Sequence, residues 1–227
     1  MKIDRDKPLP DHTKLDYYEC YAKVILEDLF ADRYGVLAIS DKPDLQNNEK
    51  DIGIEVTSAD SPKHREAVKL WYTMPFVSKE KQKSNKERME QLGVEYQGGI
   101  QTWPVISYSD SEIARYPIEY FLNVVNKKAK KLNEGGYKSF SSYDLFVYSE
   151  IYVSKSLLPQ IKKVLENINY ADKKFSKIYL CAQEKFINFD MQGNTFNIVF
   201  IDNKQYGYAI KAREMVILGE KTVNLGH

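Results

Sequence analysis

Residues 42–60 read KPDLQNNEKDIGIEVTSAD, and they combine the signals of a turn, a strand and two acidic side chains, Asp44 and Glu55. Its second half, DIGIEVTSA (51–59), has the alternating apolar residues of a β-strand. Asn47-Asn48 marks a turn before that strand, so the flanking residues are expected to form a hairpin. Glu55 interrupts the apolar run, and a buried carboxylate is costly unless a cation, a donor or water replaces its hydration. Something is therefore expected to lie opposite Glu55.

A second carboxylate is expected beside Glu55. Alternation along the strand places Glu55, Thr57 and Ala59 on one face, opposite Ile52, Ile54, Val56 and Ser58. Asp44 follows Pro43 at the other end of the hairpin, so it can reach the face that carries Glu55. Two carboxylates this close repel each other, and a divalent cation with oxygen ligands relieves the repulsion. The alternative is that Glu55 pairs with a lysine or lies at the sheet edge.

A third carboxylate lies on a predicted helix over residues 14–31. Glu19 falls inside the apolar stripe of this helix, whereas Asp16, Lys23 and Glu27 cluster on its polar side. The pattern therefore aims Glu19 at the core, where a lone glutamate needs a partner or a function. The alternative is that Glu19 lies at the edge of the stripe and reaches solvent.

The rest of the chain predicts an α/β core with a mixed central sheet flanked by helices, in one domain over residues 1–227. Residues 62–110 resemble an inserted, mainly helical region. The remaining expected helices cover 117–132, with a possible start at 111, and 156–168. The expected strands are 34–40, 142–153, KIYLCAQ (177–183), KFINFDM (185–191), TFNIVFI (195–201) and YGYAIKA (206–212), so residues 175–227 are predicted to be β-rich.

Composition excludes several classes of protein. No stretch has the roughly 18 apolar residues of a membrane helix, and the polar N-terminus does not resemble a signal peptide, so we expect a cytoplasmic protein without a membrane partner. Two cysteines, Cys20 and Cys181, argue against a disulfide scaffold or a thiolate zinc site. Residues 1–60 carry 14 acidic and 8 basic side chains, a net charge of −6, so the overall +1 leaves +7 for the rest.

Two basic stretches account for much of the positive charge. KEKQKSNKER (79–88) and KKAKKLNEGGYK (127–138) each contain five Lys or Arg residues. Such runs are usually solvated helix faces, and the alternative is contact with phosphate groups.

The order of the acidic residues resembles a known family. A glutamate on the first helix, then Pro43-Asp44, then Glu55-Val56-Thr57, is similar to the PD-(D/E)xK nuclease superfamily, which has the restriction-endonuclease-like fold. The resemblance covers residues 15–60 with specific residues and extends as a topology to about residue 153. It implies that Asp44 and Glu55 bind Mg²⁺ or Mn²⁺, that Glu19 completes the site, and that Val56 offers its backbone carbonyl.

The chain departs from the family at Thr57, where most members have lysine. Threonine cannot supply the positive charge that positions the attacking water. Some members, including certain viral cap-snatching endonucleases, carry threonine there, and others take the lysine from a nearby helix. On the helix at 117–132, Lys128 lies at the margin of the apolar face and is the first candidate, with Lys131 second. The alternative for either lysine is surface solubility.

The resemblance implies metal-dependent hydrolysis of phosphodiester bonds in DNA or RNA. Lys128 or Thr57 would orient the water, and a homodimer is possible by analogy with the family. The basic stretches would contact the nucleic-acid backbone through Lys83, Lys86, Lys127 and Lys131, and bases could stack on Tyr96, Trp103 or Tyr108. Two alternatives remain. One is a nuclease fold that has lost catalysis and binds nucleic acid or protein, and the other is an α/β interaction protein whose three carboxylates never meet.

Overall fold

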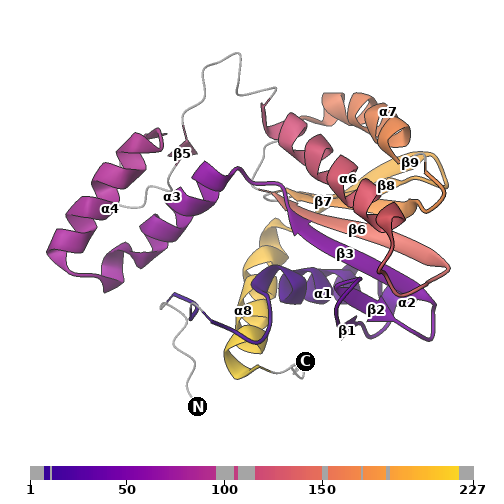
Figure 1. The fold of residues 1–227 in the computed structure, drawn as a ribbon, viewed down its shortest axis with the longest axis horizontal. Coiled ribbons are helices and arrows are strands. Elements are labelled where there is room, and N and C mark those ends of the chain that lie inside the picture. Colours follow the sequence, from indigo (N-terminus) through magenta and orange to yellow (C-terminus); the bar gives the residue numbers. More distant parts are fainter. Residues whose placement is uncertain are drawn as a thin grey trace.

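The computed structural model describes residues 8–10, 12–95, 105–106, 116–149, 153–169, 171–182 and 185–219. Its centre is a seven-stranded sheet with helices on both faces (Figure 1). In spatial order the strands are β1 (Ala38–Ile39), β2 (Leu45–Asn47), β3 (Ile52–Ser58), β6 (Ser142–Ser149), β7 (Phe175–Ala182), β8 (Lys185–Asp190) and β9 (Thr195–Phe200). The central strands β3, β6 and β7 are parallel and the outer pairs antiparallel. The predicted α/β class with a mixed sheet flanked by helices is therefore confirmed.

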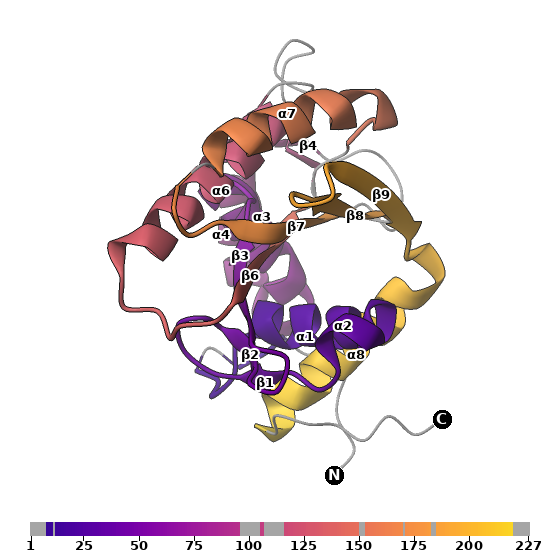
Figure 2. The same cartoon turned by 90° about the vertical axis from the view of Figure 1, so that its right-hand side faces the viewer.

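One face of the sheet is covered by helices from the two ends of the chain (Figure 2). These helices are α1 (Tyr17–Leu29), α2 (Ala31–Tyr34) and α8 (Asp202–Leu218). Asp16 caps α1, because its side chain accepts a hydrogen bond of 2.7 Å from the backbone N–H of Tyr18. The buried stripe of α1 packs with Ile52, Ile54 and Val56 of β3, as the alternation along that strand predicted.

The other face is covered by two helices from the middle of the chain, α6 (Tyr116–Glu134) and α7 (Leu158–Ile168), the latter preceded by a 3-10 turn at Lys155–Leu157. The predicted apolar face of α6 is confirmed, since Phe121, Val125, Ala129 and Leu132 are buried. Glu55 and Thr57 alternate with the residues that face α1, so they lie on the α6 side of β3. This geometry brings the C-terminal half of α6 to the candidate site.

A helical hairpin projects from the end of β3 (Figure 1). It consists of α3 (Pro62–Thr73), a 3-10 turn (Met74–Phe76) and α4 (Lys79–Gln91), and Ser61 and Ser78 cap the two helices. Its small core joins Ala67 of α3 to Met89 of α4. It leads into a two-stranded pair, β4 (Val94–Glu95) with β5 (Val105–Ile106). These elements lie in the segment 62–110 that was predicted to be inserted.

Two sequence predictions about secondary structure are wrong. YGYAIKA (206–212) is not a strand but part of α8, so residues 175–227 are β-rich only as far as Phe200. Tyr208, Ala212, Met215 and Val216 are buried at helical spacing against the first helix, and this tertiary packing outweighs the strand propensity of tyrosine and isoleucine. The expected strand over 34–40 is wrong in its extent: Tyr34 is the last residue of the short helix α2, and only Ala38–Ile39 forms a strand.

Among the described residues, no helix is both long and apolar enough to cross a membrane.

Candidate active site

The β2–β3 hairpin brings Asp44 level with Glu55. The two strands are antiparallel with Leu45 opposite Ile54, so the residue before β2 meets the next residue of β3. The Asp44 carboxylate accepts a hydrogen bond of 2.7 Å from the backbone N–H of Val56. Asp44 lies just before β2, and its side chain, not a backbone carbonyl, accepts the hydrogen bond from this N–H of β3. The predicted approach of Asp44 to Glu55 is confirmed.

Glu55 is buried, and only one of its two carboxylate oxygens has a hydrogen-bond partner among the described residues. Only 4% of the residue is exposed. One oxygen, Oε1, lies 2.5 Å from the ammonium nitrogen of Lys128, whereas Oε2 has no hydrogen-bond partner among the described residues. The same ammonium nitrogen lies 3.5 Å from the Val56 carbonyl oxygen. The alternative in which Glu55 pairs with a lysine is therefore confirmed. Lys128 contacts both oxygen donors that the family resemblance assigns to a metal ion, and one buried carboxylate oxygen of Glu55 remains unsatisfied.

Glu19 and Asp44 both have raised pKa values, and neighbouring carboxylates contribute to both. Glu19 is half-buried on α1, and burial together with the charges of Asp44, Asp16 and Glu55 raises its pKa to about 7. Burial and the charge of Glu55 raise the pKa of Asp44 to about 6, although the Val56 N–H and Lys128 act in the opposite direction. Glu19 therefore lies between the two sequence-based alternatives, since it is neither buried in the core nor fully exposed to solvent. The carboxylate charges at Glu19, Asp44 and Glu55 destabilise one another.

The three carboxylates do not form a closed metal cage in this structure. Within the part of the chain that the structure describes, no three His, Cys, Asp or Glu side chains are arranged closely enough to hold a metal ion. Their coupling is electrostatic, and Lys128 supplies positive charge at Glu55. The donor set fits a hard divalent cation in chemistry, since it consists of carboxylates and one backbone carbonyl and leaves Glu55 Oε2 without a partner.

The supposed polar side of α1 is also covered. Lys23 is 3% exposed and donates hydrogen bonds to the Leu37 carbonyl and to Glu27, which in turn accepts from the Leu37 N–H. The prediction that Lys23 and Glu27 point away from the core is therefore wrong. The segment around β1 folds over them, and the ion pair satisfies both charges locally.

The other predicted site residues differ in their surroundings. Thr57 is half-buried on the strand that carries Glu55, whereas Lys127 and Lys131 of α6 are exposed. The Lys131 ammonium lies 6.0 Å from the centre of the Tyr137 ring. Burial, the charge of Glu55 and hydrogen bonding toward its carboxylate raise the pKa of the Tyr137 hydroxyl, although among the residues that the structure describes no contact of hydrogen-bond geometry reaches Glu55 Oε2. Tyr137 therefore lies near the site. Tyr137 was not predicted as a site residue, because a tyrosine after two glycines belongs to no recognisable sequence pattern.

A second buried carboxylate, Asp144 of β6, was also missed and contrasts with Glu55. It is 0% exposed, accepts hydrogen bonds from Arg33 at 2.8 Å and from the Tyr34 hydroxyl at 2.7 Å, and also binds the Lys177 N–H at 2.9 Å. Its side chain lies on the α1 face of the sheet. Asp144 is thus a fully satisfied structural ion pair, whereas Glu55 is not.

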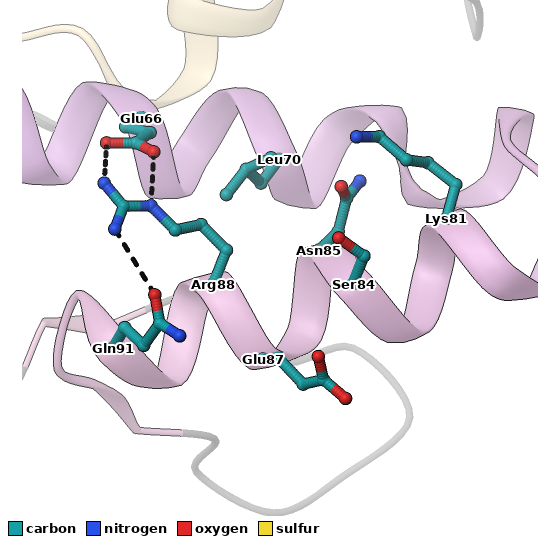
Figure 3. Close-up of a pocket in the computed structure, with 8 residues that line it drawn as sticks. All are labelled: Glu66, Leu70, Lys81, Ser84, Asn85, Glu87, Arg88 and Gln91. Atoms are coloured by element: carbon teal, nitrogen blue, oxygen red, sulfur yellow. Dashed lines mark hydrogen bonds and ion pairs between the residues drawn. The ribbon is translucent and has the colours of Figure 1, made fainter.

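The helical hairpin carries the other basic stretch. A groove between its helices has Glu66 of α3 joined to Arg88 of α4 by hydrogen bonds of 2.7 and 3.0 Å, with Arg88 also bonded to Gln91 (Figure 3). Lys83 and Lys86 are exposed on α4 and do not line this groove. The three aromatic residues proposed for base stacking, Tyr96, Trp103 and Tyr108, lie outside the described residues.

Comparison with known proteins identifies no relative. No protein-family model matches the chain, and no curated protein or solved structure is significantly similar to it.

Proposed function

We propose that this chain is a metal-dependent nuclease with a restriction-endonuclease-like core that hydrolyses phosphodiester bonds of DNA or RNA. The observation that carries the proposal is the state of Glu55, which is buried, paired on one oxygen with Lys128 and unpartnered on the other. Asp44 lies level with it, and burial together with the charge of Glu55 raises the pKa of Asp44. A protein maintains such an arrangement at a cost in stability, which is typical of functional sites.

Asp44, Glu55, Glu19 and the Val56 carbonyl would hold Mg²⁺ or Mn²⁺, each offering the oxygen ligands that these ions prefer. When bound, the cation supplies Lewis-acid polarisation of the scissile phosphate and a water of lowered pKa. Position 57 carries threonine where the motif has lysine, and Lys128 takes over the role of that lysine, because its ammonium group lies against Glu55 and the Val56 carbonyl. It supplies the positive charge that orients the attacking water.

The nucleic-acid backbone would be contacted by exposed lysines on two elements. Lys127 and Lys131 extend from the helix that carries Lys128, and Lys83 and Lys86 extend from the projecting hairpin. Exposed lysines at these positions bind phosphate through charge and are sensitive to salt.

A second candidate is a nuclease fold that binds nucleic acid or protein without cutting. The observation that favours it is the ion pair of Lys128 with Glu55, together with the absence of a three-carboxylate metal group among the described residues. This protein would bind substrate and leave it intact.

The test combines metal binding with cleavage. Thermal unfolding is followed during titration with Mn²⁺, and labelled single- and double-stranded DNA and RNA are incubated with the protein and Mn²⁺. Glu55→Gln removes the charge and keeps the shape, and Glu49→Gln is the matched control on the exposed turn of the same hairpin. The proposal expects wild type and Glu49→Gln to be stabilised by Mn²⁺ and to cut, and Glu55→Gln to do neither.

Other outcomes are equally informative. Binding without cleavage in the wild type supports the inactive module. Cleavage by Glu55→Gln at the wild-type rate rejects this site, and a wild type that neither responds to Mn²⁺ nor cuts rejects the nuclease.

A further inference from the structure

Pro43, the residue before Asp44, lies in a space that exists because residue 53 has no side chain. A Cβ atom added at Gly53 would lie 2.5 Å from Pro43 Cγ and 2.9 Å from Phe140 Cδ2. Real Cβ atoms essentially never approach other atoms within 3.0 Å. The backbone of Gly53 is not in the left-handed region, so glycine is needed here for space and not for conformation.

The chain around Asp44 is held by hydrogen bonds from three directions. The Lys42 carbonyl accepts from the Lys138 N–H at 2.9 Å, and the Pro43 carbonyl accepts from the buried Gln46 side chain at 3.0 Å. The Asp44 carbonyl accepts from the Ser40 N–H at 2.8 Å. These hydrogen bonds restrain the backbone on both sides of Pro43. Because Asp44 is the next residue in this restrained segment, a displacement of Pro43 is expected to displace Asp44 as well.

Phe140 is the second side chain that fills the space above Gly53, beside Pro43. Its ring lies edge-on to Tyr143, with 6.2 Å between the ring centres, and its backbone N–H donates to the Tyr143 hydroxyl at 3.1 Å. The same hydroxyl donates to the Lys138 carbonyl at 2.8 Å. The segment 138–140 is thus fixed to β6 and, through Lys138, to the residue preceding Pro43.

We propose that Gly53 and Phe140 are positioning residues for Asp44: they seat Pro43 so that the Asp44 carboxylate meets the Val56 N–H beside Glu55. Gly53 and Glu55 are two residues apart on β3 and share a face, so a proline seated on Gly53 delivers the following residue to the neighbourhood of Glu55. The consequence for metal binding rests on the proposed function, whereas the placement of Asp44 does not.

The geometry sets the size of the effect. Ordinary contact begins at 3.4 Å, so a methyl group at residue 53 must move Pro43 Cγ by about 0.9 Å, the difference between 3.4 and 2.5 Å. If Asp44 is displaced by the same amount along its 2.7 Å hydrogen bond from the Val56 N–H, the distance becomes about 3.6 Å, which is no longer a hydrogen bond. Losing one such bond is expected to speed exchange of the Val56 amide about tenfold.

The experiment measures amide hydrogen exchange by NMR in wild type, Gly53→Ala and Phe140→Leu. Gly207→Ala is the matched control, because a Cβ there meets nothing within 4 Å. The expected result is selective loss of protection at Val56 in the first two variants, about tenfold relative to the other amides of β3, and no such change in the control. Phe140→Leu loosens the seat without adding atoms, so the test survives if Gly53→Ala does not fold.

Two results would overturn the proposal. One is unchanged protection at Val56 in the variants that fold, and the other is an equal loss at all β3 amides, which indicates general destabilisation. Mn²⁺ titration of the same proteins separates the two proposals. If the wild type ignores Mn²⁺ while Val56 responds selectively, the nuclease is rejected and the positioning role stands.

Discussion

Removing the charge of Asp44 is expected to stabilise the metal-free protein at neutral and alkaline pH. Asp44→Asn keeps a carbonyl oxygen that can accept the hydrogen bond from the Val56 N–H, but it abolishes the repulsion with Glu55. A pKa raised from 3.8 to about 6 means that the folded state binds the Asp44 proton more tightly than the unfolded state does. The ionised form therefore destabilises the fold.

The magnitude follows from that shift. A difference of about 2.2 units at 1.36 kcal/mol per unit is about 3 kcal/mol, which solvent screening at this partly exposed carboxyl reduces to about 2 kcal/mol. The cost is absent below the unfolded pKa of 3.8 and complete above the folded pKa of about 6. For a chain of this length, about 2 kcal/mol corresponds to a rise in Tm of about 4–8 °C.

The assay is thermal unfolding of both proteins from pH 4 to pH 8 in buffer containing a chelator. Their Tm values should coincide near pH 4 and separate as the pH rises, with the variant higher at pH 8. Asp41→Asn, at an exposed carboxylate nearby, is the control and should show no such separation. Added Mn²⁺ should narrow or reverse the order by stabilising only the wild type. A variant less stable than the wild type at pH 8 in chelator would refute the reasoning.

Three further predictions test other contacts. Lys128→Met removes the partner of buried Glu55 and should lower the free energy of unfolding by about 3 kcal/mol in chelator, with part of the loss recovered on adding Mn²⁺. Asp144→Ala leaves the half-buried guanidinium of Arg33 and the buried Tyr34 hydroxyl without this acceptor and should cost about 3–5 kcal/mol in denaturant unfolding, yet keep the wild-type Mn²⁺ shift. Reversing the charge of Lys83 and Lys86 should leave the Tm unchanged while weakening nucleic-acid binding at low salt, and unchanged affinity across salt concentrations would exclude the hairpin from the interface.

The local patterns that predicted the sheet and hairpin were reliable because each depends on neighbouring residues. Alternation in β3 correctly separated Glu55 from Ile54 and Val56, and the hairpin correctly brought Asp44 beside Glu55. The margin position of Lys128 on its helix correctly predicted that this lysine, unlike Lys127, reaches inward. In each case a period of 2 or 3.6 residues determines where the side chain points.

The same reasoning failed where distant segments cover one another. Residues 206–212 have strand propensity, but packing against α1 makes them helical. Lys23 was predicted to lie on the polar side of its helix, but the segment around Leu37 covers it. Tyr137 has no local signal because it lies in the loop after α6, and only the packing of this loop against the core brings it near Glu55.

The class of fold, the approach of Asp44 to Glu55 and the margin position of Lys128 on its helix could all be predicted from the sequence, because strand alternation, turn signals and helix periodicity act within a few residues. Three properties could be known only from the folded chain: Glu55 retains an unpaired oxygen, the charge of Asp44 acts on Glu19, and Pro43 packs between Gly53 and the ring of Phe140. These properties depend on burial and on contacts between segments far apart in the chain, which a local pattern does not contain.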